Sequence, residues 1–242
     1  MRPVAAALAP LTRRLVYPAR ATRVSPAGTT LHLTVTGTPL RGWEVNPGRR
    51  RGLVYFGGNG ESVQHLRPEL ERRFPDHTCY LLAYRGYGAS AGRPSERALV
   101  GDALALVDHV ATRHPDAPVD VIGRSLGSGV AVQVAVRRPV ERLVLVTPFD
   151  SLYAVARDLV PRLPMRRLLH DHFDSAAVAD RLGAEVLVLR AGRDTLVRPD
   201  RTTSLLAALP GRPRVVELPD ADHSDLVEDP TYWRSIAEFL HP

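Results

Sequence analysis

Lysine is absent from this chain of 242 residues, so all 32 of its basic residues are arginine. Such exclusive use of arginine indicates GC-rich coding before it indicates any partner. Cysteine occurs once, as Cys79, which excludes an intrachain disulfide and leaves the redox compartment open. Because Cys79 stands within an apolar run, we expect it to be a small core residue rather than a nucleophile.

Long apolar runs are missing as well. No stretch of about 18 apolar residues occurs, so the sequence predicts no transmembrane helix. The short apolar run from Val4 to Leu11 makes a poor signal peptide, because Pro10 interrupts it and two arginines follow soon after. A cytoplasmic protein is therefore the expectation.

The sequence has no long basic run, although the net charge is +6 and the sequence pI is about 10.1. The arginines are scattered in short groups, no predicted helix carries a basic stripe, and no nucleic-acid-binding motif is present. These observations argue against a nucleic-acid partner. Attraction to an anionic membrane surface is compatible with the charge, but solvated faces explain the arginines better. The sequence leaves the oligomeric state open.

The composition is that of an ordinary globular protein, with 44% hydrophobic and 24% charged residues. The length is compatible with one large domain. Residues 1–28 are rich in alanine, proline and arginine and predict an N-terminal arm. Residues 29–242 predict one α/β domain.

Strand and helix patterns alternate after an initial hairpin, which predicts a mostly parallel sheet of about eight strands with helices on both faces. The predicted strands are 30–36, 42–45, 53–56, 79–83, 119–122, 143–146, 186–189 and 214–218. The predicted helices are 62–74, 95–114, 126–138, 151–163, 175–182, 202–209 and 232–240. Residues 150–183 interrupt the alternation, and we expect them to form a small cap over an active site.

The segment from Val119 to Gly129 is the strongest local signal in the chain. An apolar run leads into Gly123-Arg124-Ser125-Leu126-Gly127, and helix-compatible residues follow. A sharp strand-to-helix turn needs small residues on both sides of its corner, and it exposes the corner hydroxyl above the sheet. Ser125 is therefore the predicted nucleophile, placed at a helix N-terminus that favours developing negative charge.

A serine hydroxyl needs a base to activate it, and that base needs an acid to orient it. Such groups are expected on loops at the carboxyl ends of the strands. Asp194 and His223 each follow a predicted strand, and the order Ser125, Asp194, His223 is the one expected with this turn. Asp150, which also follows a strand, is the alternative acid.

A tetrahedral intermediate needs two donors directed at its oxyanion. We expect these to be the backbone N–H of Leu126 and the N–H of Asn59, in the loop Gly57-Gly58-Asn59-Gly60-Glu61. A glycine loop that opens a helix also suits a phosphate. This loop lacks both the G-x-G-x-x-G spacing and the Lys-Ser/Thr ending of a phosphate-binding loop, so a phosphate site is not predicted here.

Three longer strings carry a resemblance to a known family. Residues 84–96, YRGYGASAGRPSE, are the most specific of them, and 123–129 and 147–151 accompany them. All three are similar to segments of the α/β-hydrolase superfamily, in a small-lidded branch of α/β-hydrolase domain proteins. The resemblance spans about residues 30–240. It implies the α/β-hydrolase fold, a triad, an oxyanion hole and no cofactor; eukaryotic relatives include lipid hydrolases and depalmitoylases, and serine-peptidase relatives are common nearby.

The chain departs from that branch in two places. Gly57-Gly58 stands where relatives commonly have His-Gly, which predicts a more mobile loop. Many relatives carry an N-terminal membrane segment, whereas this chain begins with a short alanine-rich run, so membrane anchoring is not carried over. Within the first string, Arg85 is expected to brace its loop by pairing with a carboxylate.

The resulting hypothesis is a serine hydrolase that cleaves small-molecule carboxylic esters or thioesters through an acyl-enzyme. The small cap predicts an open site for short or medium acyl groups. Two alternatives remain at this point: a peptide or amide hydrolase with the same triad, and a non-catalytic binding protein of the same fold. A binding protein has no need of all three triad residues, which argues against the latter.

Overall fold

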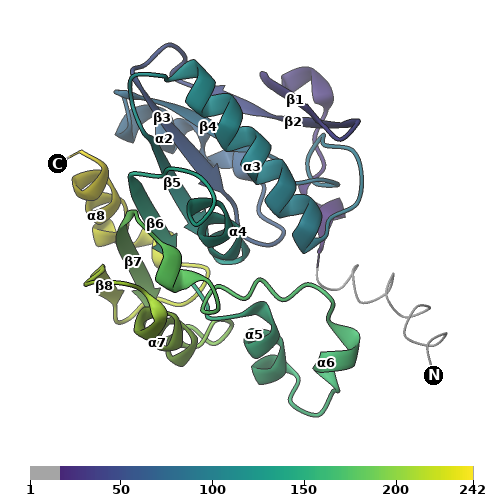
Figure 1. Ribbon diagram of the computed structural model, residues 1–242, viewed down its shortest axis with the longest axis vertical. Coiled ribbons are helices and arrows are strands. Elements are labelled where there is room, and N and C mark those ends of the chain that lie inside the picture. The colour runs from purple at the N-terminus through teal and green to yellow at the C-terminus, as the bar shows by residue number, and fades with distance from the viewer. Residues whose placement is uncertain (1–16, 242) are drawn as a thin grey trace.

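The sheet of the protein has eight strands in the order β1-β2-β4-β3-β5-β6-β7-β8 (Figure 1). The computed structural model describes residues 17–241. The strands are β1 Leu31–Val35, β2 Thr38–Val45, β3 Arg51–Phe56, β4 His77–Leu82, β5 Val119–Arg124, β6 Arg142–Val146, β7 Glu185–Ala191 and β8 Arg214–Leu218. β2 pairs antiparallel with β1 and β4, and every other neighbouring pair is parallel. The predicted class and the predicted hairpin are confirmed.

Helices cover both faces of this sheet. The α-helices are α2 Arg67–Arg73, α3 Glu96–Arg113, α4 Leu126–Ala135, α5 Leu152–Leu159, α6 Met165–Leu168, α7 Pro199–Ala208 and α8 Pro230–Leu240. The 3₁₀ turns are η1 Ala19–Thr22, η2 Pro26–Gly28, η3 Val63–Leu66, η4 Ala179–Arg181 and η5 Leu226–Glu228. In Figure 1, α3 and α4 lie in front of the sheet and α2 lies behind it. Trp233 of α8 packs edge-on against Phe74, which directly follows α2, with ring centroids 6.4 Å apart.

The centre of the sheet is buried from both sides. Every residue of β4 and β6 is buried, which is the pattern of parallel strands covered by helices on both faces. Every residue of α4 is buried as well, because this helix packs on β3, β5 and β6 and beside α3, and Phe149 and Phe173 lie against it at Gly129. The amino terminus of α4 is therefore fixed at the carboxyl end of β5, and this placement positions the candidate site.

The helix predicted over 62–74 is divided in two. A 3₁₀ turn, η3, comes first, and the α-helix begins only at Arg67. Pro68 stands in the first turn of α2, where its missing N–H leaves no bond unmade. In a longer helix its ring would clash with the carbonyl of the preceding turn. The single predicted helix is therefore wrong at its amino-terminal part.

The connection from β6 to β7 contains the segment expected as a cap. α5 and α6 lie at the lower end of Figure 1, beyond the carboxyl ends of the parallel strands. The helix predicted over 175–182 is wrong, because only the short turn η4 forms there. The N–H of Ala176 donates to the carbonyl of Asp150 at 3.0 Å, while Val178 and Arg181 make turn bonds to the carbonyls of Ser175 and Val178, three residues earlier, instead of α-helical ones.

Residues 17–28 pack on the domain at several points. The hydroxyl of Tyr17 donates to Asp171 at 2.8 Å, the N–H of Gly88 donates to the hydroxyl of Thr22 at 3.0 Å, and the indole of Trp43 donates to the carbonyl of Gly28 at 2.7 Å. The remainder of the predicted arm, residues 1–16, lies outside the described residues. None of the helices within residues 17–241 combines the length and apolarity that a bilayer crossing requires.

Candidate active site

Ser125 occupies a strained corner between β5 and α4. Its backbone has φ of 51° and ψ of −117°, a conformation that side-chain-bearing residues rarely adopt. A Cβ on Gly127 would lie 2.0 Å from the carbonyl oxygen of Phe56, and one on Gly123 would lie 2.4 Å from that of Gly127. Only glycine fits at these two positions, so the glycines allow the strand, the corner and the helix to approach each other.

Asp194, His223 and Ser125 lie in one line of hydrogen bonds. His223 Nδ1 lies 2.7 Å from Asp194 Oδ2, and His223 Nε2 lies 3.0 Å from Ser125 Oγ. Asp194 follows β7 and His223 follows β8, and both strands are parallel to β5 and end at the same edge of the sheet. The side chain of Asp194 is 1% exposed and that of His223 15% exposed. The structure therefore brings together the three residues that the sequence singled out.

The carboxylate of Asp194 is held in one orientation. Its Oδ1 accepts the backbone N–H groups of Leu196 at 2.9 Å and Val197 at 2.7 Å. These two bonds leave Oδ2 directed at His223. One oxygen of Asp194 thus holds the loop turn, and this turn orients the other oxygen toward the histidine.

Asp150, the alternative acid, faces other partners. Its Oδ1 accepts the N–H of Ser151 at 2.8 Å, and its Oδ2 pairs with Arg201 at 3.1 Å. Burial raises the pKa of this carboxyl group above its ordinary value. The geometry therefore favours Asp194 as the partner of the histidine.

The glycine loop after β3 lies directly beside the serine. A Cβ added to Gly58 would lie 3.6 Å from Ser125 Cβ. The loop is tied down by two tyrosines: Tyr84 donates to the carbonyl of Gly57 at 2.9 Å, and Tyr87 donates to Asn59 Oδ1 at 2.8 Å. The sequence analysis expected a more mobile loop because the histidine is missing, but it did not foresee these two bonds, which restrain the loop. The roles of the Asn59 and Leu126 N–H groups remain a prediction.

Glu61 and Arg124 are residues of this site that the sequence analysis did not assign. Glu61 Oε2 accepts the N–H of Gly58 at 2.5 Å and lies 3.3 Å from Arg124 Nη1. Arg124 Nη2 in turn donates to the carbonyl of His223 at 3.1 Å. Burial opposes the charge of Arg124, but the Glu61 carboxylate, Tyr55 and Tyr232 together raise the pKa of the arginine above its ordinary value. The only signal in the sequence is their position beside Asn59 and Ser125.

The predicted brace at Arg85 is present. Its guanidinium makes a two-pronged contact with the carboxylate of Asp102 in α3, with Nε 2.9 Å from Oδ2. It also donates to the hydroxyl of Thr38 at 3.0 Å. Bidentate pairing of this kind fixes orientation, so Arg85 anchors the loop 84–96 to α3 and β2.

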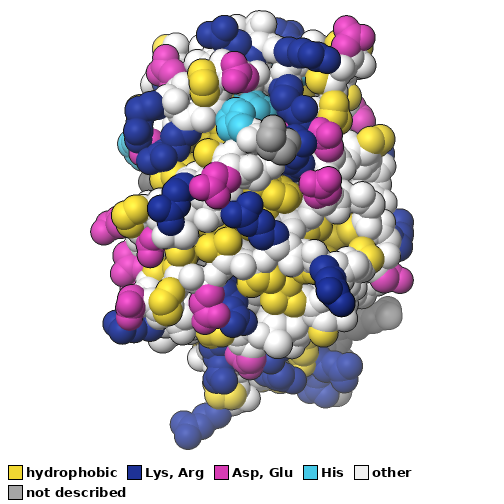
Figure 2. Space-filling view, turned by 90° about the vertical axis from the view of Figure 1, so that its left-hand side faces the viewer, with side chains coloured by type: hydrophobic (Ala, Val, Ile, Leu, Met, Phe, Trp, Pro, Cys, Tyr) yellow, Lys and Arg dark blue, Asp and Glu magenta, His cyan; other side chains and the backbone are white. Residues whose placement is uncertain are grey.

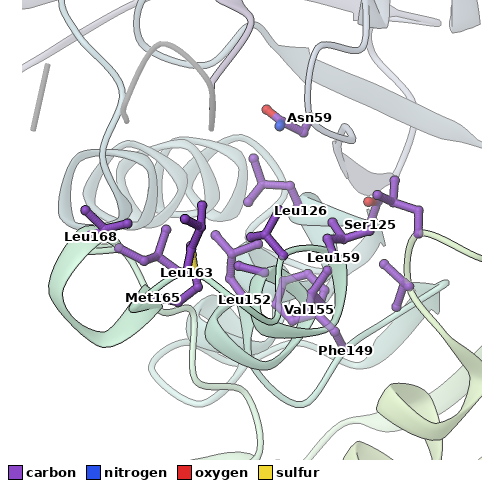
Figure 3. A pocket seen from close by; sticks show the side chains of 15 residues that line it. Asn59, Ser125, Leu126, Phe149, Leu152, Val155, Leu159, Leu163, Met165 and Leu168 are labelled. Atoms are coloured by element: carbon purple, nitrogen blue, oxygen red, sulfur yellow. The ribbon is translucent and has the colours of Figure 1, made fainter. Parts of the chain in front are cut away.

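An apolar cavity of about 370 Å³ opens beside Ser125 (Figure 3). The side chains of α5, α6 and their connection form most of its wall, including Leu152, Val155 and Leu168. Ser125 and Asn59 are the polar residues of its lining. A pocket with an apolar wall and a few polar groups at one end suits a ligand with a hydrocarbon part and one reacting polar group.

Metal-binding groups are not apparent in the part of the chain that the structure describes. Within residues 17–241, no three histidine, cysteine, aspartate or glutamate side chains are grouped so as to hold a metal ion.

The sheet order, the corner serine and the cap together define an α/β hydrolase, and comparison with known proteins agrees. The hydrolase family described as serine aminopeptidase, S33 matches residues 56–168. An uncharacterized protein of Mycobacterium tuberculosis is 36% identical over 94% of this chain and 86% of its own length. Lysophosphatidylserine lipase ABHD12 of Gallus gallus is 45% identical, over 43% of this chain and 30% of that protein.

Solved structures show the same fold. The Pyrococcus furiosus esterase Pf2001 aligns with a TM-score of 0.72 at 18% identity, covering 90% of this chain and 96% of that one. The enol-lactonase from Burkholderia xenovorans LB400 aligns with a TM-score of 0.68 at 18% identity, covering 88% and 100%. The chain belongs to the α/β-hydrolase family, as the string at 84–96 predicted, and this membership supports hydrolase activity on small molecules.

Proposed function

We propose that this protein is a serine hydrolase that cleaves carboxylic esters or thioesters through an acyl-enzyme. The observation that carries the proposal is the line of hydrogen bonds from Asp194 through His223 to Ser125, which ends at an apolar pocket. A hydroxyl within hydrogen-bond reach of an imidazole, itself oriented by a buried carboxylate, is the arrangement that nucleophilic acyl transfer requires.

In the first half-reaction, Ser125 Oγ attacks the acyl carbon while His223 Nε2 takes the hydroxyl proton. The resulting oxyanion is held by the N–H groups of Leu126 and Asn59, and Leu126 opens α4, whose amino terminus favours negative charge. His223 then gives its proton to the departing alcohol or thiol, which leaves the acyl group on Ser125. Asp194 keeps the Nδ1–H tautomer in place and stabilises the imidazolium.

In the second half-reaction, water attacks the acyl-enzyme. His223 takes a proton from that water, and the second tetrahedral intermediate collapses as the proton returns to Ser125 Oγ. A carboxylic acid is released, and the enzyme regains its starting state. All proton transfers pass through one imidazole, so no further titrating group is needed.

The pocket favours an acyl substrate over an aminoacyl one. A free α-ammonium group needs a carboxylate or several acceptors to replace its water. Among the described residues that line the pocket there is no aspartate or glutamate, and most of the wall is hydrocarbon. Ester or thioester cleavage therefore ranks above the aminopeptidase activity that the S33 family description suggests.

The proposal is tested by labelling with a fluorophosphonate probe. Wild type, Ser125→Ala and the control Ser204→Ala are compared, since Ser204 is an exposed serine on α7. We expect labelling of wild type and the control and none of Ser125→Ala, with p-nitrophenyl ester hydrolysis following the same pattern. Aminoacyl p-nitroanilides test the peptidase alternative. A folded wild type that neither labels nor hydrolyses would support the non-catalytic binding protein instead.

A further inference from the structure

The exposed apolar surface of this protein is concentrated at the mouth of the pocket. In the part of the chain that the structure describes, five large hydrophobic side chains are exposed, and four of them also line the pocket. The four, called the rim below, are Leu159 at 49%, Val160 at 39%, Leu163 at 51% and Leu196 at 42% exposure. Single exposed leucines are ordinary, but a group around a pocket entrance marks a contact surface.

Exposed arginines accompany this rim on the cap segment. The cap arginines are Arg157 on α5, Arg162 in the connection, and Arg166 and Arg167 on α6, and all four are exposed. Within residues 17–241 none of the four makes an ion pair or a side-chain hydrogen bond. Asp158 is the one acidic residue between positions 157 and 167, and it pairs with Arg201 at 3.2 Å. Figure 2 shows arginine and apolar side chains together at the lower end of the molecule, where the cap lies in Figure 1.

We propose that the rim and the cap arginines dock on an anionic lipid bilayer. Apolar side chains at the tip of the cap enter the boundary between headgroups and acyl chains, while the guanidinium groups pair with lipid phosphates. This inference rests on the proposed function in one further respect: the docked pocket mouth opens onto the acyl layer, so that the chain of a monoacyl or diacyl lipid ester enters the cavity directly.

A bilayer explains the surface better than a second copy of this chain does. A symmetric dimer through the rim would bring the cap arginines of both copies together, and the one carboxylate among positions 157–167, Asp158, is already paired. An anionic bilayer supplies hydrocarbon for the rim and, next to it at the headgroup level, phosphates for the arginines. The rim residues also belong to the pocket wall, so docking through the rim would place a lipid ester at the entrance to Ser125.

The test is vesicle co-sedimentation of the full chain, with Ser125→Ala used so that the vesicles are not hydrolysed. Vesicles of phosphatidylcholine are compared with vesicles of phosphatidylcholine and phosphatidylglycerol. We expect binding to the anionic vesicles that weakens with added salt, since the Debye length is only about 8 Å at physiological ionic strength. In that background, Arg166→Gln/Arg167→Gln should weaken partitioning by roughly five-fold for each arginine, or on the order of twenty-fold for the pair.

The matched control is Arg49→Gln/Arg50→Gln, which removes the same charge from exposed residues at the amino-terminal end of β3, away from the cap. We expect its partitioning to equal that of the parent. An equal loss in both pairs, or equal binding to neutral and anionic vesicles, would show that no docking surface exists. A dimer in sedimentation that the cap variant dissociates would assign the rim to a second copy and also overturn the proposal.

A second readout separates docking from catalysis. With Ser125 intact, the cap variant should hydrolyse a water-soluble short-chain p-nitrophenyl ester like wild type, because neither arginine lines the pocket. Its hydrolysis of a monoacyl lipid embedded in anionic vesicles should fall with its partitioning. Vesicle binding without fluorophosphonate labelling would sink the proposed function and leave the docking surface standing; labelling without vesicle binding would do the reverse.

Discussion

Glu61 and Arg124 form an ion pair, 3.3 Å between Oε2 and Nη1, that connects the glycine loop with the last residue of β5. Both side chains are largely buried, at 14% and 17% exposure. Because Glu61 accepts the N–H of Gly58 and Arg124 donates to the carbonyl of His223, the pair connects three segments of the site. It is placed to align the glycine loop with Ser125.

If the pair positions the loop, Arg124→Met should lower kcat by roughly ten- to one hundred-fold, below the 10²–10³ that loss of a whole oxyanion donor costs. KM for a short p-nitrophenyl ester should change little, and Arg124→Lys should restore part of kcat. Arg138→Met, which breaks an exposed pair with Asp108, serves as the control. A change confined to KM would mean that the pair acts on substrate binding instead.

Replacing each candidate acid in turn by asparagine separates their roles. In Asp194→Asn, the carbonyl oxygen keeps the bonds from Leu196 and Val197, so the amide NH₂ faces His223. That donor forces the imidazole into the tautomer with hydrogen on Nε2, which is unable to accept the serine proton, and kcat should fall on the order of 10³–10⁴-fold. Asp150→Asn should leave kcat nearly unchanged in the same steady-state assay. The reverse ranking would show that the acid is Asp150.

Two glycine substitutions test the corner by thermal unfolding. Gly127→Ala places a Cβ 2.0 Å from the carbonyl oxygen of Phe56, so it should destabilise the protein by about 1–3 kcal/mol or more and lower Tm. Gly101→Ala, in the exposed middle of α3 with no atom within 4 Å, should stabilise by up to about 1 kcal/mol. A Gly127→Ala variant as stable as wild type would contradict the close approach of α4 and β3.

The dependence of kcat/KM on acyl length reports on the pocket. Burial of each methylene contributes about 0.8 kcal/mol, so kcat/KM should rise about four-fold per methylene until the cavity is filled. Ala156→Phe introduces a ring into the wall formed by α5. It should shorten the optimal chain while leaving acetate esters good substrates. A series of p-nitrophenyl esters measures both profiles, and a flat wild-type profile would mean that the acyl group lies elsewhere.

Cys79 provides a test of burial. It is fully buried in β4, and this burial raises the pKa of its thiol to about 12. The reactive thiolate is therefore scarce at pH 8 in the folded protein and common in the unfolded chain, whose thiol has an ordinary pKa. Reaction with a disulfide reagent should be slow by orders of magnitude until denaturant is added, when one thiol per chain should react. Rapid reaction of the native protein would contradict the placement of β4.

Much of the fold is readable from local pattern. The strands β3 to β8 were predicted within a few residues because each is a short run between turns, and Ser125 was identified because the glycines beside it form a local pattern between a strand and a helix. Asp194 and His223 follow from the same logic, since parallel strands deliver their next residues to one edge. Asp150 also follows a strand, so the sequence favoured Asp194 but left Asp150 open as the alternative acid.

The sequence by itself determined the order of elements, the corner serine and the edge of the sheet where its partners gather, because these depend on periodicity and on neighbours along the chain. Only the tertiary structure decided which carboxylate faces His223, that Glu61 pairs with Arg124, and that the cap builds an apolar pocket. Those outcomes depend on contacts between residues far apart in sequence. The helix predicted over 175–182 is also decided at this level, since the segment is tied to the distant Asp150 carbonyl through the N–H of Ala176 and forms only the short turn η4.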